Sequence, residues 1–82
     1  SFDIDGLKPN LCPNTGTPVV GGFELEEISF LLFELVKAGK KIVAFDLNEV
    51  APGNNDDWDA NVGARALWNL VCATEKSRRN DN

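Results

Sequence analysis

Two pairs of acidic residues in this 82-residue chain have the types and spacing that bind cations. Asp3 and Asp5 are separated by one residue, so in an extended strand both side chains project to one side, where their oxygens can share a divalent metal ion. Two adjacent carboxylates repel otherwise, and a metal ion stabilises both in the charged form. The spacing predicts a metal site, although Asp side chains also commonly accept hydrogen bonds from the amides of a following loop.

Asp46 and Glu49 pose the same question later in the chain, where they close an apolar run. An acid at that position needs a metal, a cation or backbone donors. Glu49 in a cleft would suit a cationic group such as a guanidinium, which pairs with a carboxylate through two hydrogen bonds. The pattern equally allows Asp46 to cap the loop and Glu49 to stay solvated. Between the two acidic pairs, Thr15 and Thr17 offer hydroxyls that could meet a substrate or hold the loop.

Strands and turn-rich loops are the first elements that must position these residues. Residues 1–5 alternate in polarity as a strand does, and residues 6–22 are rich in proline and glycine, which predicts a long ordered loop. Residues 42–47 form an almost unbroken apolar run, which is typical of a strand buried on both faces of a parallel sheet. A second turn-rich loop follows at residues 51–59.

Two amphipathic helices complete the predicted elements. From about residue 23 to residue 36, apolar side chains recur every three to four positions, glutamates crowd the first turn, and Gly39 is suited to end the helix. The second helix is expected from about residue 60 to residue 74, with Asp57 or Asp59 as its N-cap. Its predicted core-facing residues are Val62, Ala66, Leu70 and Val71.

The order strand, helix, strand, helix predicts an α/β fold with parallel strands. Two strands are not a whole sheet, so we expect one partial domain over residues 1–82, the C-terminal β-α-β-α part of a larger sheet, with exposed apolar helix faces and open strand edges. Residues 76–82 are polar and are expected to form a frayed tail. Ligands of such sheets bind outside the carboxyl ends of the strands, where both acidic pairs are expected.

Charge and composition exclude several classes of partner. The formal net charge is −5 and there is no histidine, so a nucleic-acid partner has no support. No apolar run approaches the roughly 20 residues that span a bilayer, and no signal sequence is present, so we expect no membrane partner and a cytoplasmic protein. Cys12 and Cys72 lack the spacing of a metal or redox motif, and a disulfide between them stays open.

Two ordered blocks of the chain resemble one known family. Residues 1–7 (Ser-Phe-Asp-Ile-Asp-Gly-Leu), followed by residues 13–18 (Pro-Asn-Thr-Gly-Thr-Pro) and Gly21-Gly22, look like the signature of the ureohydrolases, which are arginase, agmatinase and formimidoylglutamase. Residues 45–52 (Phe-Asp-Leu-Asn-Glu-Val-Ala-Pro) are similar to the later acidic strand of that family. The resemblance covers nearly the whole chain.

The resemblance implies a three-layer α/β/α fold around a parallel sheet and two Mn²⁺ ions that activate a water for attack on a guanidino or formimino carbon. It implies that Asp3 bridges both ions and Asp5 binds one of them. Glu49 would pair with the cationic head of a small guanidino or formimino substrate, and Thr17 would line the pocket. Asp46 would support the metal ligands without touching the metal.

The family's remaining metal ligands, histidines and further aspartates, come from an earlier part of its sequence, so the missing N-terminal part of the same fold is an implied partner. With no histidine, the isolated chain is expected neither to hold two Mn²⁺ tightly nor to turn over substrate. Residues 58–65 are similar to an agmatinase- or formimidoylglutamase-like branch, and a homo-oligomer of the parent stays open. The competing hypothesis is a self-sufficient acidic module that loosely holds Mg²⁺ or Ca²⁺ through Asp3 and Asp5.

Overall fold

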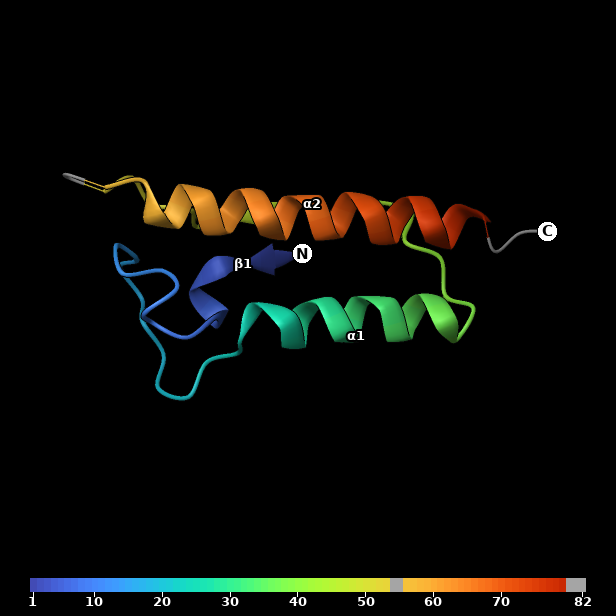
Figure 1. Cartoon of the computed structure of the whole chain (residues 1–82), viewed down its shortest axis with the longest axis horizontal. Helices are drawn as coiled ribbons and strands as arrows, with labels where there is room; N and C mark the ends of the chain where they lie inside the picture. Colours follow the sequence, from blue (N-terminus) through green and yellow to red (C-terminus); the bar gives the residue numbers. More distant parts are fainter. Residues whose placement is uncertain (54–55, 80–82) are drawn as a thin grey trace.

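The computed structural model describes residues 1–53 and 56–79, and the chain follows the predicted alternation of strands and helices (Figure 1). The elements in chain order are β1 (Phe2–Asp3), the 3-10 turn η1 (Ile4–Gly6), α1 (Leu25–Lys37), β2 (Leu47–Asn48) and α2 (Trp58–Arg79). The α/β prediction is therefore confirmed at the level of a small parallel sheet with helices.

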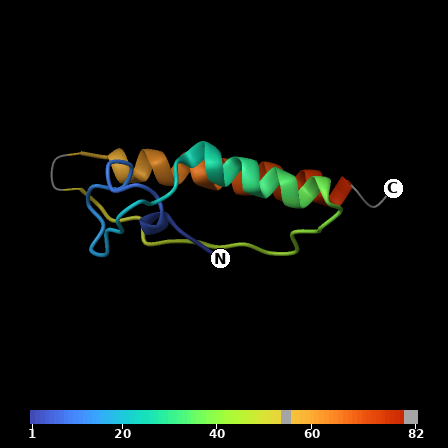
Figure 2. The ribbon, with the colours of Figure 1, turned by 90° about the horizontal axis from the view of Figure 1, so that it is seen from below.

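The strands pair in parallel and the helices form a separate layer. Phe2 lies opposite Leu47 and Asp3 opposite Asn48, and the Phe2 amide donates to the Asp46 carbonyl at 3.0 Å. Figures 1 and 2 show α1 and α2 side by side in one layer. The extended segment that joins the two helices runs beneath them in a second layer, as Figure 2 shows. Within the described residues, both helices lie on one face of the sheet.

The second strand is shorter and more exposed than the apolar run predicts. Strand pairing is limited to Leu47–Asn48, and the Val43 side chain is 91% exposed, so the expectation of a strand at residues 42–47 buried on both faces is wrong for this chain. Its only strand neighbour in the described residues is β1, which contributes just Phe2 and Asp3 to the pairing. An apolar run needs neighbours on both edges and cover on both faces to be buried.

The core forms where the chain turns directly after β1. The predicted strand at residues 1–5 ends at Asp3, because Ile4 begins η1. A 3-10 turn has three residues per turn, so Ile4 and Leu7 fall on the same side, and both are fully buried. They form one cluster with Cys12 and with Val62 of α2, which ties the turn to that helix. Burial raises the pKa of the Cys12 thiol, and the Asp59 and Asp5 carboxylates raise it further.

Helix α1 starts two residues after the predicted position and ends as expected. The Glu24 amide donates to the Glu27 carboxylate at 2.8 Å, which satisfies a backbone donor that has no partner within the helix. Lys37 lies in the last turn, and Gly39 has a φ of +84°, a left-handed conformation that glycine adopts without steric cost. Val36 is the buried residue of this helix.

Helix α2 begins two residues before the predicted start and ends five residues after the predicted end. Asp57, one of the two predicted N-cap residues, directly precedes this helix, and its carbonyl accepts the Asn61 amide at 2.9 Å, while the neighbouring Asp56 carboxylate accepts the Trp58 amide at 3.1 Å. Residues 76–79 form its last turn, where Arg78 pairs with Glu75 at 2.6 Å. The predicted frayed tail at residues 76–82 therefore overlaps α2, and residues 80–82 lie outside the described residues.

The buried face of α2 largely matches the predicted one. Val62, Ala66 and Leu70 are buried as expected, whereas Val71 is 42% exposed and Ala73 is buried in its place. Ala73 continues the spacing of three to four residues from Ala66 and Leu70, which Val71 breaks.

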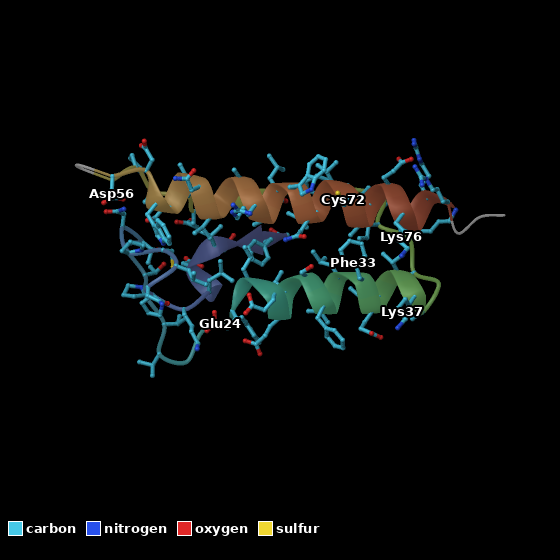
Figure 3. The ribbon with its side chains drawn as sticks, viewed as in Figure 1. Glu24, Phe33, Lys37, Asp56, Cys72 and Lys76 are labelled. Atoms are coloured by element: carbon cyan, nitrogen blue, oxygen red, sulfur yellow. The ribbon has the colours of Figure 1, made fainter. Side chains whose placement is uncertain are left out.

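Large apolar side chains remain exposed on both helices. They are Phe30, Leu31 and Leu35 on α1 and Trp58, Leu67, Trp68 and Val71 on α2. At the far end of the helix pair, the Lys76 ammonium lies 5.8 Å from the centroid of the Phe33 ring (Figure 3). None of the described helices is both long enough and apolar enough to cross a bilayer.

Gly22 sits where the loop at residues 6–22 returns to its own start. The Lys8 amide donates to the Phe23 carbonyl at 2.9 Å, and the Phe23 amide donates to the Gly6 carbonyl at 3.0 Å. This pairing brings Gly22 so close that an added Cβ would meet the Leu7 carbonyl. The loop therefore needs a residue without a side chain at this position.

Gly22→Ala should destabilise the folded state by about 1–3 kcal/mol, because the backbone must move to accept the methyl group. Gly6→Ala is the matched control, since a Cβ there meets nothing within 4 Å. Urea unfolding followed by circular dichroism measures both changes. Equal stability of the two variants would show that the loop does not close as described.

Candidate functional site

Asp3 lies at the carboxyl end of β1, beside Asn48 of β2. It is exposed and precedes η1, but its side chain makes no capping hydrogen bond to that turn. The alternative role of Asp3 as a loop cap is therefore not observed. Its carboxylate sits at the edge of the parallel sheet where ligands of α/β proteins bind.

Asp5 is positioned differently from the sequence prediction. It lies in η1 and not in an extended strand, so the rule that residues i and i+2 point to one side does not apply to Asp3 and Asp5. The turn that buries Ile4 is the reason for this departure. The Asp5 carboxylate instead accepts the Thr17 hydroxyl at 2.6 Å, a short bond of the kind that charged acceptors form.

The turn at Thr15, Gly16 and Thr17 brings that hydroxyl to Asp5. The Thr15 amide donates to the Cys12 carbonyl at 3.1 Å, and the Thr15 hydroxyl accepts the Thr17 amide at 3.3 Å. Thr15 thus holds the loop, which is one of its two predicted roles. Thr17 also makes a loop contact, and this contact is with one of the two predicted metal ligands.

Asp46 directly precedes β2 and so lies at the amino end of that strand. It was expected at the carboxyl end. It accepts hydrogen bonds from the Ser1 hydroxyl at 2.6 Å and from the Asn48 side-chain amide. The hydrogen bond from Ser1 has the larger effect and the bond from Asn48 a smaller one, and both lower the pKa of the Asp46 carboxyl below its usual value. The alternative of Asp46 as a cap for the following loop is not observed.

Glu49 directly follows β2 and has a φ of +66°. Left-handed backbone is unfavourable for a residue with a Cβ, by roughly 1–2 kcal/mol, and is otherwise filled by glycine or asparagine. Strain of this kind persists where the surrounding structure requires it, and it gathers at functional sites. Nothing in the sequence predicted this conformation at the predicted substrate contact.

The chemistry of the donors decides which metal the site can accept. Asp3 and Asp5 offer hard carboxylate oxygens, which suit Mn²⁺, Mg²⁺ or Ca²⁺. Across the described residues, no three or more histidine, cysteine, aspartate or glutamate side chains gather into a group able to hold an ion. Asp3 and Asp5 therefore offer oxygen ligands that suit a hard cation, and no third such side chain gathers with them in the described residues.

One contact near the site involves residues that the sequence did not single out together. The Asp59 carboxylate is fully buried and accepts hydrogen bonds from the backbone and side-chain amides of Asn14. The two residues are 45 positions apart, so no local pattern relates them. Asp59 drew attention only as a candidate N-cap, and its side chain points to the loop instead of to its own helix.

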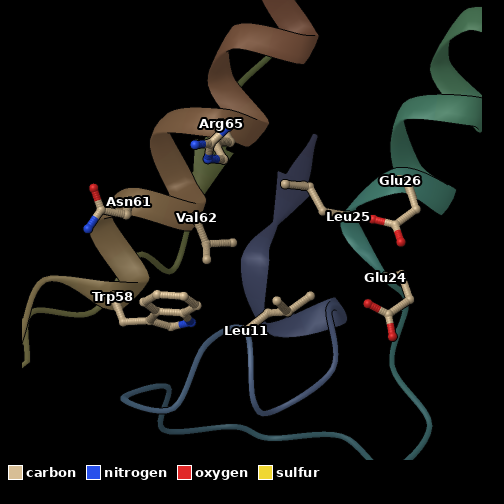
Figure 4. A pocket seen from close by; sticks show the side chains of 8 residues that line it. All are labelled: Leu11, Glu24, Leu25, Glu26, Trp58, Asn61, Val62 and Arg65. Carbon is tan, nitrogen blue, oxygen red and sulfur yellow. The ribbon is translucent and has the colours of Figure 1, made fainter.

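A pocket of about 370 Å³ lies between the start of α1, the loop and the start of α2 (Figure 4). Leu25 and Val62 face each other across it from the two helices. None of the predicted site residues lines this pocket, so it is not the predicted site. Its lining residues are Leu11, Glu24, Leu25, Glu26, Trp58, Asn61, Val62 and Arg65.

Comparison with known proteins decides the family. Residues 1–73 match the model of the Arginase family. The chain belongs to the arginase family. This confirms the ureohydrolase resemblance at the level of that family, and it does not single out the agmatinase or formimidoylglutamase branches.

Individual relatives place the chain within a longer family sequence. It is 44% identical to an arginase of Neurospora crassa over 80 residues, which cover 94% of this chain and 22% of the relative. It is 46% identical to an arginase of Emericella nidulans over 81 residues, 99% of the chain and 23% of the relative. Human Arginase-1 is 46% identical over 52 residues, 63% of the chain and 16% of the relative. The chain thus spans about a fifth of the length of these relatives. No solved structure matched significantly.

The hydrogen bond from Ser1 to Asp46 predicts a measurable titration. Because the pKa of Asp46 is lowered in the fold, this bond stabilises the fold above the ordinary carboxyl pKa of about 4, and the stabilisation is lost as the pH falls through the lowered value. Ser1→Ala should raise the pKa of Asp46 toward its ordinary value, measured by NMR titration of the carboxyl carbon. Ser29→Ala, which removes a hydroxyl bonded to Asn69, is the control and should leave it unchanged. An unshifted Asp46 titration in Ser1→Ala would refute this assignment.

Proposed function

We propose that this chain supplies the carboxylate part of a binuclear Mn²⁺ site in a hydrolase that cleaves a C–N bond of a guanidino or formimino substrate. The observation that carries the proposal is the match of residues 1–73 to the Arginase family, which spans both acidic pairs. The arrangement at the carboxyl end of β1, where Asp3 is exposed and Asp5 is held by Thr17, supports it.

Each predicted residue has a role that its chemistry can perform. Asp3 would bridge the two ions and Asp5 would bind one of them, with the Thr17 hydroxyl fixing the orientation of the Asp5 carboxylate. When bound, the two Mn²⁺ ions supply a nucleophilic water at neutral pH and polarise the substrate. Thr17 would also line the pocket, and Asp46 would hold the paired strands in place through Ser1 and Asn48.

Glu49 would recognise the cationic head of the substrate. A carboxylate accepts two parallel hydrogen bonds from a guanidinium, which sets both affinity and orientation. The left-handed backbone at Glu49 supports a constrained role for this residue. Since the relatives reported above are named arginases, a guanidino substrate is favoured over a formimino one.

The remaining part of the same fold would complete the site and cover this chain. A three-layer α/β/α arrangement would place further strands beside β1 and β2 and further helices over the open face of the sheet. The exposed apolar residues of α1 and α2, such as Phe30 and Trp68, support the need for such cover. The cytoplasmic location stays a prediction from the sequence.

The chain alone should bind Mn²⁺ weakly and should show no hydrolase activity, because it offers two of the required carboxylates and no histidine. Isothermal titration of the 82-residue chain with MnCl₂ tests this. Two tight sites would refute it. A single site of equal affinity for Mg²⁺, Ca²⁺ and Mn²⁺ in a cooperatively folding chain would favour the competing acidic module.

In the longer protein that carries this chain, Asp3→Asn and Glu49→Gln should fail in different ways. Asp3→Asn should lower bound Mn²⁺ and activity together, since it removes a metal ligand. Glu49→Gln should leave bound Mn²⁺ unchanged but weaken substrate binding about 10–100-fold, the equivalent of one charge-assisted hydrogen bond. Metal analysis and steady-state kinetics separate the two effects.

Glu75→Gln is the control for the loss of charge, because Glu75 pairs with Arg78 at the far end of α2. It should change neither the bound Mn²⁺ nor the KM for substrate. A Glu49→Gln variant with the kinetics of Glu75→Gln would exclude Glu49 as the substrate contact.

A further inference from the structure

Asp59 is a fully buried carboxylate in the first turn of a helix that has solvent on its outer side. In the described part of the chain, the hydrogen bonds to its oxygens all come from Asn14. The Asn14 backbone amide lies 3.3 Å from both oxygens, and its side-chain amide lies 2.9 Å from one of them. A buried carboxylate without donors is strongly unfavourable, so the fold depends on Asn14 being held at this place.

The start of α2 holds the same stretch of loop through two more contacts. The Asn14 side-chain amide also donates to the Asp56 carboxylate at 3.0 Å, and the Trp58 indole donates to the Asn10 carbonyl at 3.1 Å. The Trp58 amide donates to the Asp56 carboxylate at 3.1 Å, so Asp56 and Trp58 are themselves joined at the start of α2. Residues 10–14 are therefore fixed to the end of a 22-residue helix, which is a rigid element compared with the loop.

Only a short stretch of chain separates Asn14 from the carboxylate at the sheet edge. Thr15 follows Asn14, the Thr15 hydroxyl accepts the Thr17 amide, and the Thr17 hydroxyl donates to Asp5. The Thr15 amide donates to the carbonyl of Cys12, which is buried in the core. A displacement of Asn14 would therefore move the Thr17 hydroxyl that donates to Asp5.

We propose that Asn14 and Asp59 are positioning residues that hold the Thr17 hydroxyl against Asp5 and so fix the Asp5 carboxylate for its metal ion. This inference rests on the proposed function, because it assigns Asp5 as a Mn²⁺ ligand. Neither residue touches metal or substrate. They act on Asp5 only through the loop and the Thr17 hydroxyl. Substitutions of Asn14 and Thr17 should therefore not have additive effects on Mn²⁺ affinity.

The test compares Mn²⁺ affinity among variants of the longer protein that carries this chain. Asn14→Ala and Asp59→Ala should each weaken Mn²⁺ binding about 10-fold, the lower end of the effect of residues that orient metal ligands. Thr17→Ala should weaken it at least as much. Adding Asn14→Ala to Thr17→Ala should cause no further loss, since both act through the same contact. Asp59→Asn keeps an acceptor oxygen for the Asn14 side chain and should recover most of the affinity.

Ser77→Ala is the control for a purely structural effect. Ser77 is also fully buried on α2 and accepts the Ile42 amide at 3.0 Å, but it lies at the opposite end of the helix. This variant should lower the melting temperature and leave Mn²⁺ affinity unchanged. If Asp59→Ala prevents folding, Asn14→Ala carries the test, because it leaves every residue of α2 intact.

Two results would overturn the inference. One is an Asn14→Ala protein that melts earlier but binds Mn²⁺ as the wild type does, and the other is a further loss when Asn14→Ala is added to Thr17→Ala. If the wild-type protein binds no Mn²⁺, the proposed function fails by itself. Hydrogen exchange at the Thr17 amide then decides the inference, since it must accelerate in Asn14→Ala and not in Ser77→Ala.

Discussion

The burial of Ile4 and Leu7 against Val62 of α2 is the interaction on which the rest of this structure depends. Each such side chain contributes about 1.5–3 kcal/mol when it is removed from water. To bury both residues, the chain must leave the strand after Asp3 and turn through η1. That turn places Asp3 at the edge of the sheet and directs Asp5 toward the loop that follows.

Three carboxylates in the described part of the chain accept hydrogen bonds from uncharged groups. Asp5 is bonded to Thr17, Asp46 to Ser1, and Asp59 to Asn14, and every one of these donors is neutral. Neutral donors fix the orientation of a carboxylate without cancelling its charge. A site that must attract metal ions or a cationic substrate retains its negative charge under this arrangement.

Local patterns in the sequence predicted the two helices, because these depend on neighbouring residues. Helix α1 was predicted to within two residues, since apolar spacing, Glu27 and Gly39 act over one or two turns. The extent of the second strand was mispredicted because an apolar run is buried as a strand only where it has neighbouring strands and cover on both faces, and β1 pairs only with Leu47 and Asn48 in the described residues. The turn at Ile4 and the Asn14 contact with Asp59 depend on α2, which packs against the start of the chain, and no local spacing encodes them.

The proposed function depends on Asp3 and Asp5 being ligands of a pair of Mn²⁺ ions. Crystals of the longer protein, grown with Mn²⁺ and measured on both sides of the manganese absorption edge, test it most directly. We expect two anomalous peaks, with the Asp3 carboxylate in contact with both and the Asp5 carboxylate in contact with one. Manganese peaks whose ligands include neither Asp3 nor Asp5 would contradict it.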